Sequence, residues 1–429
     1  MPGIARAALY EKLKKHGITR ITRARLPTTA GRGMLGIGKQ TISGELSVIH
    51  ALNNVPKIVY GFGAVSCAGA EIIRLGGKRA FIVTDPGITA IGLLRALEES
   101  LSAASVAFAV YDKAELEPSA SSIRKCADAA KAFKADCVIG VGGGSPLDTA
   151  KAALVLLSNE GDIEKYFGMN MVPNPCLPAM LIPTAAGTGS EVTSISVLTN
   201  PQTGAKQGVV SDYLYARVVL LDPELTFGLP PHVTAMTGMD AFVHAMESFV
   251  GLAATPFTDA VNLQAMRLVS ANLRKAYANG DDKNARAGML YAATLAGMGF
   301  SQTQNGIIHA VGTSLPSSCG LPHGLAMAAL APMGMSYNCI SVPEKYAQVA
   351  EILGVTPCGT ALDIARKGID AMRGLLADVD IAPGLKAHGV AREHLAGTAE
   401  RAAGAKRLID NNPRKANAGQ ILTLLEEHY

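Results

Sequence analysis

Short runs of apolar, β-forming residues alternate with helix-forming stretches over residues 57–225, and this alternation limits the fold most strongly. The runs are "KRAFIVTD" (78–85), "VAFAVYD" (106–112), "ADCVIGVGGGS" (135–145) and "AMLIPTAAGTGS" (179–190), which read as strands that end at turns or run into loops. Strand–helix alternation of this kind implies a parallel sheet flanked by helices. The sequence therefore predicts an α/β domain in this half of the chain.

The pattern changes after "VVLLDPELTFGLPP" (218–231). Strand-like runs stop, and helical periodicity rich in Ala, Leu and Met continues to the C-terminus, interrupted by Gly and Pro. A chain of 429 residues is also too long for one typical core. We predict an α/β domain over residues 51–227 and an all-helical domain over residues 228–429.

The first forty residues, within a predicted extension over residues 1–50, contain nine Lys or Arg and one acid, Glu11. An Arg-rich, acid-poor start is typical of organelle transit peptides. The alternative is a basic surface helix, "ARAALYEKLKKHG", that ends at Gly17. We favour the basic helix.

Composition excludes several classes of partner and compartment. The formal net charge is only +4 and Trp is absent, so we expect no nucleic-acid partner. Pro and Gly interrupt the long uncharged stretches, so we expect no membrane-spanning helix and no membrane partner. Seven cysteines without a CxxC pair argue against a disulfide framework and favour a reduced, cytoplasmic compartment.

Three consecutive glycines interrupt "VIGVGGGSPLDTAKAA" (138–153) where a strand is followed by a helix. Ser145 suits the N-cap, Pro146 the first helical position and Asp148 the acidic first turn. A diphosphate can approach backbone N–H groups that no side chain covers, here at Gly142, Gly143 and Gly144. A tight turn without a ligand would show the same glycines, and the spacing is not GxGxxG.

Asp85 lies at the carboxyl end of the strand "AFIVTD", and a loop rich in small residues, "PTAAGTGSEVT" (183–193), follows another strand. An acid at the first position can bind the adenosine ribose of a dinucleotide and repel a 2′-phosphate. It is also an ordinary turn residue. Loops at the carboxyl ends of strands converge where ligands bind in open α/β sheets.

Two segments of the helical half place polar groups in apolar surroundings. In "GMDAFVHAMES" (238–248), Asp240 and His244 are one helical turn apart. In "NGIIHAVGTSLPSSCGLPHGLAM" (305–327), His309 and His323 have uncharged neighbours. A local Asp–His hydrogen bond and structural histidines would explain each feature separately. Together, three imidazoles and one carboxylate suit Fe²⁺ or Zn²⁺ rather than Ca²⁺ or Mg²⁺.

From about residue 55 onwards the chain resembles the iron-containing (group III) alcohol dehydrogenases. "GGGSPLDTAK", "PTAAGTGSEVT", "LPPHVTAMTGMDAFVHAMES", "HAVGTSLPSSCGLPHG" and "NPR" (412–414) appear in the family's order and approximate spacing. The resemblance implies a Rossmann-like N-terminal domain and an all-α metal-binding domain, as in dehydroquinate synthase. It places the active site in the cleft between the two domains.

The resemblance also implies roles for individual residues. The implied metal ligands are Asp240, His244, His309 and His323. The implied cofactor contacts, which include the glycine loop, are Asp85, Gly142, Gly143, Gly144, Ser145, Asp148, Thr184, Thr188, Val197, Lys206 and Leu225. Asp85 would favour NAD over NADP, and Phe300 falls on the wall of the substrate pocket.

Three positions depart from the family's pattern. The family usually has a histidine four residues after the one matched by His309, and here that residue is Thr313. A proton relay through Thr313 and water is our hypothesis, and we expect no catalytic residue beyond it and the metal ligands. Glu117 stands where Asn is common, and Ala185 replaces the second of a usual Thr pair.

The resemblance implies reversible hydride transfer between a small alcohol or diol and its aldehyde or ketone, with NAD and Fe²⁺. Zinc is the alternative metal, and we expect a homo-oligomer, a dimer or larger. One rival is a zinc-dependent enzyme resembling glycerol dehydrogenase. Another is a catalytically inactive binding protein on the same scaffold, which only Thr313 and Glu117 support.

Overall fold

The computed structural model describes residues 41–42, 45–46, 52–53, 55–200 and 206–429. The predicted basic helix and the alternative transit peptide lie outside these residues. Within residues 1–52 the structure describes two antiparallel strands, β1 (Thr41–Ile42) and β2 (Glu45–Leu46). Residues 53–429 form a separate compact unit, which contains all the elements discussed below.

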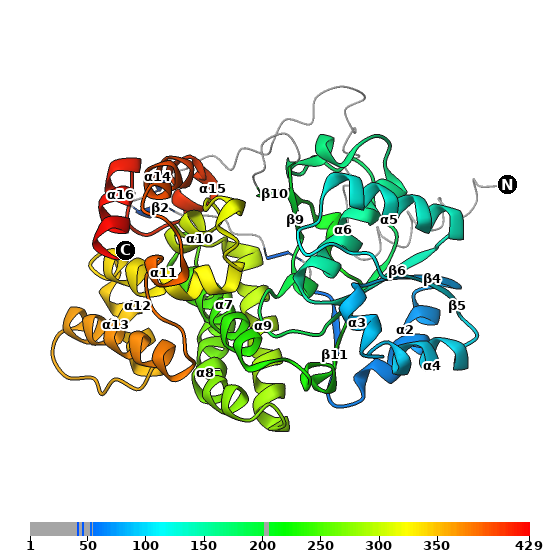
Figure 1. Cartoon of the computed structure of the whole chain (residues 1–429), viewed down its shortest axis with the longest axis horizontal. Coiled ribbons are helices and arrows are strands. Elements are labelled where there is room, and N and C mark those ends of the chain that lie inside the picture. Colours follow the sequence, from blue (N-terminus) through cyan, green and yellow to red (C-terminus); the bar gives the residue numbers. More distant parts are fainter. Residues whose placement is uncertain (1–40, 43–44, 47–51, 54, 201–205) are drawn as a thin grey trace, which may run out of the picture. The chain divides into compact units, whose positions relative to one another are not determined.

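A six-stranded sheet lies at the centre of the N-terminal half of this unit, and all its neighbouring strands are parallel (Figure 1). In sheet order the strands are β3 (Lys57–Tyr60), β11 (Val218–Leu221), β8 (Ala179–Pro183), β6 (Cys137–Gly142), β4 (Arg79–Val83) and β5 (Ala107–Tyr111). This arrangement confirms the predicted parallel α/β architecture.

Successive residues of β4 face two different cores, as the two-residue period of a strand requires. Phe81 and Val83 pack in one core, beneath α5 (Ala120–Phe133) and α6 (Gly144–Ser158). Ala80 and Ile82 pack in the other, which includes side chains of α2 (Ala68–Arg74) and α4 (Arg95–Ala103). Burial on both faces explains why these strands are continuous apolar runs.

The order of the strands creates a switch point between β4 and β6. The chain passes from β4 to β5 on one side and then crosses to β6 on the other side. The short helix α3 (Pro86–Ala90) follows β4, and α6 follows β6. Because ligands of open α/β sheets bind outside the carboxyl ends of strands at such a point, Asp85 and the glycine loop lie where a dinucleotide is expected.

A second, three-stranded sheet was not among the predicted strands. It consists of β7 (Gly168–Met169), β10 (Lys206–Val210) and β9 (Ile195–Thr199), with β10 in the middle. β9 and β10 pair antiparallel, with Val197 opposite Gly208. β9 also packs against α6, which brings this sheet beside the glycine loop.

The C-terminal half is helical, as predicted: residues 222–429 are all described and none is assigned to a strand. Its α-helices are α7 (Pro231–Val250), α8 (Pro256–Ala278), α9 (Lys283–Thr303), α10 (Ile307–Gly312), α11 (His323–Asn338), α12 (Pro343–Ile352), α13 (Ala361–Asp378), α14 (His394–Gly404), α15 (Lys406–Ile409) and α16 (Ala418–Glu427). The 3-10 helices of the unit are η1 (Ala64–Cys67), η2 (Ile163–Tyr166), η3 (Ser190–Val192), η4 (Asp212–Leu214), η5 (Pro223–Thr226), η6 (Ser317–Cys319) and η7 (Lys386–His388).

α7 is the central helix of this half and packs against α8, α9 and α11 (Figure 1). Every residue from Gly238 to Val250 is buried, which fits a helix that is apolar on nearly all sides. The polar residues in this segment therefore need partners inside the protein. Among the described helices, none is both long and apolar enough to cross a membrane.

Candidate metal centre and cofactor cleft

One face of α7 carries Asp240, His244 and Glu247, which follow one another at four- and three-residue intervals. All three side chains are buried. α10 contributes His309, and α11 begins at His323. The packing of α7, α10 and α11 thus brings together one carboxylate and three imidazoles that are up to 83 positions apart in the sequence.

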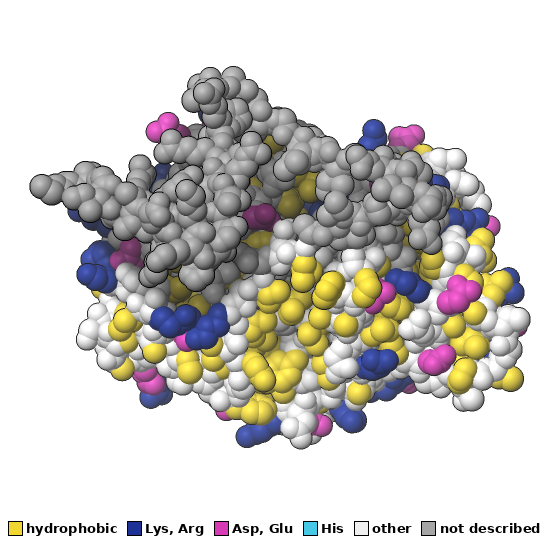
Figure 2. All heavy atoms as spheres, turned by 180° about the vertical axis from the view of Figure 1, so that it is seen from behind, with side chains coloured by type: hydrophobic (Ala, Val, Ile, Leu, Met, Phe, Trp, Pro, Cys, Tyr) yellow, Lys and Arg dark blue, Asp and Glu magenta, His cyan; other side chains and the backbone are white. Residues whose placement is uncertain are grey.

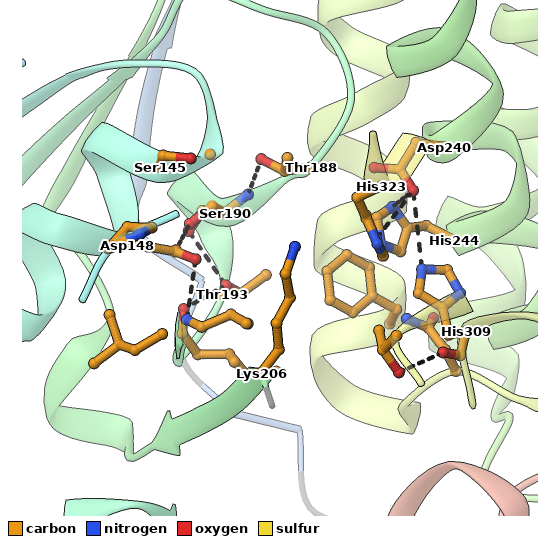
Figure 3. Close-up of a pocket in the computed structure, with 18 of the residues that line it drawn as sticks. Ser145, Asp148, Thr188, Ser190, Thr193, Lys206, Asp240, His244, His309 and His323 are labelled. Carbon is orange, nitrogen blue, oxygen red and sulfur yellow. Dashed lines mark hydrogen bonds and ion pairs between the residues drawn. The ribbon is translucent and has the colours of Figure 1, made fainter. Parts of the chain in front are cut away.

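The four predicted ligands lie together. Oδ1 of Asp240 is 3.8 Å from Nδ1 of His244, 3.9 Å from Nε2 of His309 and 3.6 Å from Nε2 of His323 (Figure 3). One ligand atom from each residue lies within 4.8 Å of all the others. Four donors held at about 2.1 Å around one ion in a tetrahedron would be roughly 3.4 Å apart, so the arrangement fits a single metal ion.

Three of these inward-facing atoms have no hydrogen-bond partner in the described structure: Oδ1 of Asp240, Nδ1 of His244 and Nε2 of His309. Leaving a buried polar atom unpaired is costly, and native proteins rarely do so. A cation at the centre of the cluster would satisfy all three atoms. Imidazole nitrogens and one carboxylate oxygen are donors that suit Fe²⁺ or Zn²⁺.

Burial sets the protonation states of the cluster. It raises the pKa of Asp240 to about 7, and the interaction with His309 opposes this shift. It lowers the pKa of His244 well below its usual value, and it lowers the pKa of His323 to about 3, in both cases with a further contribution from His309. The two imidazoles are therefore neutral at physiological pH, which is the form that binds a metal.

Glu247 orients His309, a role that the sequence analysis missed. Its Oε2 lies 2.6 Å from Nδ1 of His309, and its Oε1 accepts a hydrogen bond from the backbone N–H of Ile308 at 2.6 Å. A proton held on Nδ1 by this carboxylate leaves the lone pair of Nε2 facing the cluster. The seven-residue spacing from Asp240 was a usable signal, because it puts Glu247 on the same helical face.

We expect Glu247→Gln to weaken iron binding by about 10- to 100-fold, since an amide cannot hold the His309 proton as a carboxylate does. Retained iron can be measured against a competing chelator. Glu344→Gln, an exposed substitution in α12, is the matched control and should retain iron like the native protein. Equal retention in the two variants would rule out this role for Glu247.

Phe300, on α9, stacks on His244 with ring centroids 4.3 Å apart and an interplanar angle of 16°. It also lines the cavity into which the metal cluster opens. The side chain thus covers one side of a candidate metal ligand and lines the same cavity. Its role as a wall of the substrate pocket stays a prediction.

This main cavity, of about 240 Å³, is lined by both halves of the unit. It contains the four candidate metal ligands and several of the predicted cofactor contacts, namely Gly144, Ser145, Asp148, Thr188, Val197 and Lys206. In Figure 3 the Lys206 side chain extends into the space between Asp148 and the histidines. The predicted cofactor and metal sites therefore open on one space.

A second cavity, also of about 240 Å³, adjoins the first and shares Gly144, Ser145 and Thr188 with it. It is further lined by Asp85, Gly143 and Ala185. Three predicted contacts, Gly142, Thr184 and Leu225, line neither cavity. Thr184 is buried and its N–H donates to the carbonyl of Gly142, whereas Leu225 packs in the core beneath the sheet.

The predicted N-cap at Ser145 is wrong. α6 already begins at Gly144, its N-cap is Gly143, and no side chain caps it. Gly142 has a φ of +145°, so the chain turns within the glycine run, and the Ser145 hydroxyl donates to the carbonyl of Leu116 instead. The start of the helix stays open, and a Cβ on Gly144 would lie 2.8 Å from Cγ2 of Thr188.

Asp148 and Lys151, both on α6, form hydrogen bonds to the segment that follows β8. Asp148 accepts hydrogen bonds from Oγ of Ser190 at 2.6 Å and from the N–H of Val197 at 3.0 Å. Lys151 is fully buried; its Nζ donates to the carbonyl of Ser190 at 2.8 Å and lies 3.5 Å from Oδ1 of Asp148. It also bonds Thr193 and the Ile195 carbonyl. Sequence reasoning missed this lysine.

The same loop is attached to the helical half. Glu191 is buried in η3, and its Oε1 accepts a hydrogen bond from Oγ1 of Thr294 on α9 at 2.7 Å. Burial raises the pKa of Glu191, with Thr294 and Lys151 opposing the shift. The segment that lines the cavity between the halves is therefore held from both sides.

The departures from the family pattern lie around the cavities. Thr313 lines the main cavity, and its hydroxyl donates to the carbonyl of His309 at 2.6 Å. Glu117 lies 3.3 Å from Nζ of Lys206, so the two charges pair at the cavity wall. Because the Thr313 hydroxyl donates its proton to a backbone carbonyl, the structure does not show it donating to a water or a ligand. The relay through Thr313 stays a prediction.

Two family sequence models match almost all of the described unit. The model of the iron-containing alcohol dehydrogenases matches residues 56–223, and the model of the C-terminal region of the same family matches residues 234–429. The predicted domain boundary at residue 227/228 lies between the two matches and stays a prediction.

Individual proteins are also similar. The chain is 60% identical over 378 residues to the sulfoacetaldehyde reductase of Bilophila wadsworthia. The aligned region covers 87% of this chain and 98% of the relative. A crystal structure of a 1,3-propanediol oxidoreductase has a TM-score of 0.86 at 36% identity, covering 89% of this chain and all of the other. A sulfoacetaldehyde reductase from Bifidobacterium kashiwanohense, solved with NAD⁺, has a TM-score of 0.79 at 27% identity, covering 89% and 99%.

Proposed function

The chain belongs to the iron-containing alcohol dehydrogenase family, and we propose that it reduces a short aldehyde that carries a sulfonate group, with sulfoacetaldehyde as the first candidate. Membership makes it an NAD-dependent, metal-containing oxidoreductase that interconverts an alcohol and its aldehyde or ketone. NAD and Fe²⁺ are its cofactors. The finer choice of substrate is our proposal.

The metal cluster and the glycine loop open on one cavity, and this observation carries the proposal. Asp240, His244, His309 and His323 would hold the metal, with Glu247 orienting His309. When bound, the metal would act as a Lewis acid on the carbonyl and NADH would supply the hydride.

The chain's other residues would position the reactants. The backbone at the open start of α6 would bind the diphosphate of the cofactor, and Asp85, in the adjoining cavity, would bind the adenosine ribose. The Asp148–Lys151 network holds the loop that lines the cavity. Phe300 and the buried wall around it would keep water away from the reacting carbon.

The relative at 60% identity supports sulfoacetaldehyde over a diol, because the 1,3-propanediol dehydrogenase of Klebsiella pneumoniae is only 38% identical to this chain over a similar length. We expect the iron-loaded enzyme to oxidise NADH with sulfoacetaldehyde at a kcat/KM at least about tenfold above that for propanal, a neutral aldehyde of similar size. NADH absorbance measures both rates. Preference for propanal would contradict the proposal, and turnover of neither aldehyde would favour the inactive binding protein.

We also propose that the enzyme is cytoplasmic and forms a homo-oligomer. All seven cysteines are free thiols, as expected in a reducing compartment. β3 is an edge strand of the six-stranded sheet, its Tyr60 is exposed, and Figure 2 shows apolar side chains gathered near the middle of one face. Sedimentation of the purified enzyme as a monomer would contradict the oligomer.

A further inference from the structure

This inference rests on the proposed reduction of an anionic aldehyde and assigns the site that recognises the anion. We propose that Arg407, together with Gln304 and Asn305, binds the anionic group of the substrate. Each of the three side chains lines the main cavity that also contains the metal ligands. Arg407 thereby becomes the residue that determines specificity for small anionic aldehydes.

Arg407 reaches the cavity from α15, which packs against α10, the helix that carries His309. It is exposed and also lines a third cavity beside β7 and β10, together with Met169 and Gln207. The guanidinium therefore stands at the mouth of the main cavity. A short substrate with its carbonyl toward the metal cluster would direct its other end toward this mouth.

Among the residues that the structure describes, the charges around the main cavity leave Arg407 without a counter-charge. Of the acidic residues that line the cavity, Glu117 lies 3.3 Å from Lys206 and Asp148 lies 3.5 Å from Lys151. The third, Asp240, belongs to the metal cluster.

Within the described residues Arg407 has no ion-pair partner, and one of its Nη1–H groups donates to Oε1 of Gln304. No other described residue accepts a hydrogen bond from its remaining N–H groups, which can therefore bind an oxyanion. The planar guanidinium fork matches the oxygens of a sulfonate or carboxylate, and such charge-assisted hydrogen bonds are strong.

The turn after α9 holds the other two side chains in place. Gln304 has a φ of +74°, a conformation that residues other than glycine rarely adopt. Nδ2 of Asn411 donates to the carbonyl of Gln304 at 3.2 Å and to the carbonyl of Asn305 at 3.0 Å. Backbone strain that the surrounding structure maintains is typical of functional sites.

Asn305 provides an independent indication of a ligand. Only 6% of its surface is exposed, and it lines the cavity. Its Oδ1 is buried and has no hydrogen-bond partner in the described structure. The amide N–H groups can donate to an anion, whereas Oδ1 is an acceptor that only a donor, such as a water bound beside the anion, can satisfy.

The walls between the two ends of the cavity are apolar. Phe300 and Leu408 line it beside the metal ligands and Arg407, respectively. The methylene group of a short anionic substrate would pack against these side chains. A neutral substrate would leave the Arg407 guanidinium without an anionic partner. Sulfonates and carboxylates share the chemistry that this site recognises, so the experiment must separate them.

The test uses the iron- and NAD-loaded enzyme with unreactive ligands. We expect Arg407→Gln to weaken binding of ethanesulfonate, measured by calorimetry, by about 10- to 150-fold, as the loss of hydrogen bonds to a charged group implies. Propanoate binding tests the carboxylate, and propan-1-ol tests a neutral ligand. Arg407→Lys, which keeps the charge but not the fork, should restore part of the lost affinity.

The same variants separate the substrates. Arg407→Gln should lower kcat/KM for sulfoacetaldehyde by a similar factor and leave kcat/KM for propanal within about twofold. Lys406→Gln is the matched control: this exposed cation is adjacent in the sequence and does not line the cavity, so it should change neither value.

Failure of this inference differs from failure of the proposed function. If the native enzyme prefers sulfoacetaldehyde but Arg407→Gln changes its kcat/KM no more than that of propanal, the anion site is overturned. If the native enzyme does not reduce sulfoacetaldehyde, the proposed substrate fails. The anion site would then still stand if ethanesulfonate or propanoate binds the native enzyme and Arg407→Gln abolishes that binding.

Discussion

His309→Ala should lower kcat for short aldehydes by at least about 10³-fold, which corresponds to about 4 kcal/mol of transition-state stabilisation. The substitution removes a donor whose Nε2 lies 3.9 Å from Oδ1 of Asp240, and it leaves Glu247 without its imidazole partner. Iron content should fall with activity. NADH binding should stay within about twofold of native, because His309 lies outside the predicted diphosphate and ribose sites.

The fluorescence of NADH itself can report its binding, since the chain contains no Trp. His232→Ala is the control, because this exposed histidine near the start of α7 lies outside the cluster. A His309→Ala enzyme that keeps its iron and its activity would show that the histidine is structural.

Lys151→Met should lower the free energy of unfolding by about 3–5 kcal/mol. The lysine is fully buried, and its ammonium group bonds the carbonyls of Ser190 and Ile195. Methionine fills similar space but donates no hydrogen bond, so these buried carbonyls lose a charged donor and Asp148 loses its counter-charge. The loop that lines the cavity is fastened through the same bonds, and we expect weaker NADH binding as well.

Urea unfolding followed by far-UV circular dichroism measures this change. Lys57→Met is the control: the Lys57 side chain forms an ion pair with Glu71 but is 46% exposed. This substitution should change the free energy of unfolding by no more than about 1 kcal/mol. If Lys151→Met unfolds at the same urea concentration as this control, the buried network does not stabilise the fold.

The main sheet could be predicted because its strands are buried on both faces and therefore appear as continuous apolar runs. Residues 79–83 and 137–142 are such runs, and the structure pairs them in parallel. The small sheet could not be found in this way. β7 has only two residues, and both are exposed, so no apolar pattern marks it.

The metal cluster could be predicted because histidine and aspartate stand out in uncharged segments. Glu247 shared that signal and was overlooked. Lys151 and Arg407 were not found from the sequence, because the groups that they contact include residues of distant segments, Ser190 for Lys151 and Gln304 for Arg407. Ser145 was misassigned because the cap preference assumes a conventional turn, whereas Gly142 turns the chain earlier.

The central claim is that Asp240, His244, His309 and His323 jointly hold one metal ion beside the bound NAD. Anomalous diffraction at the iron edge, from crystals of the purified enzyme with NAD, tests it directly. We predict one iron peak about 2.0–2.3 Å from one atom of each of the four side chains. A structure without metal density there, or with any of the four turned away from a common centre, would contradict the account.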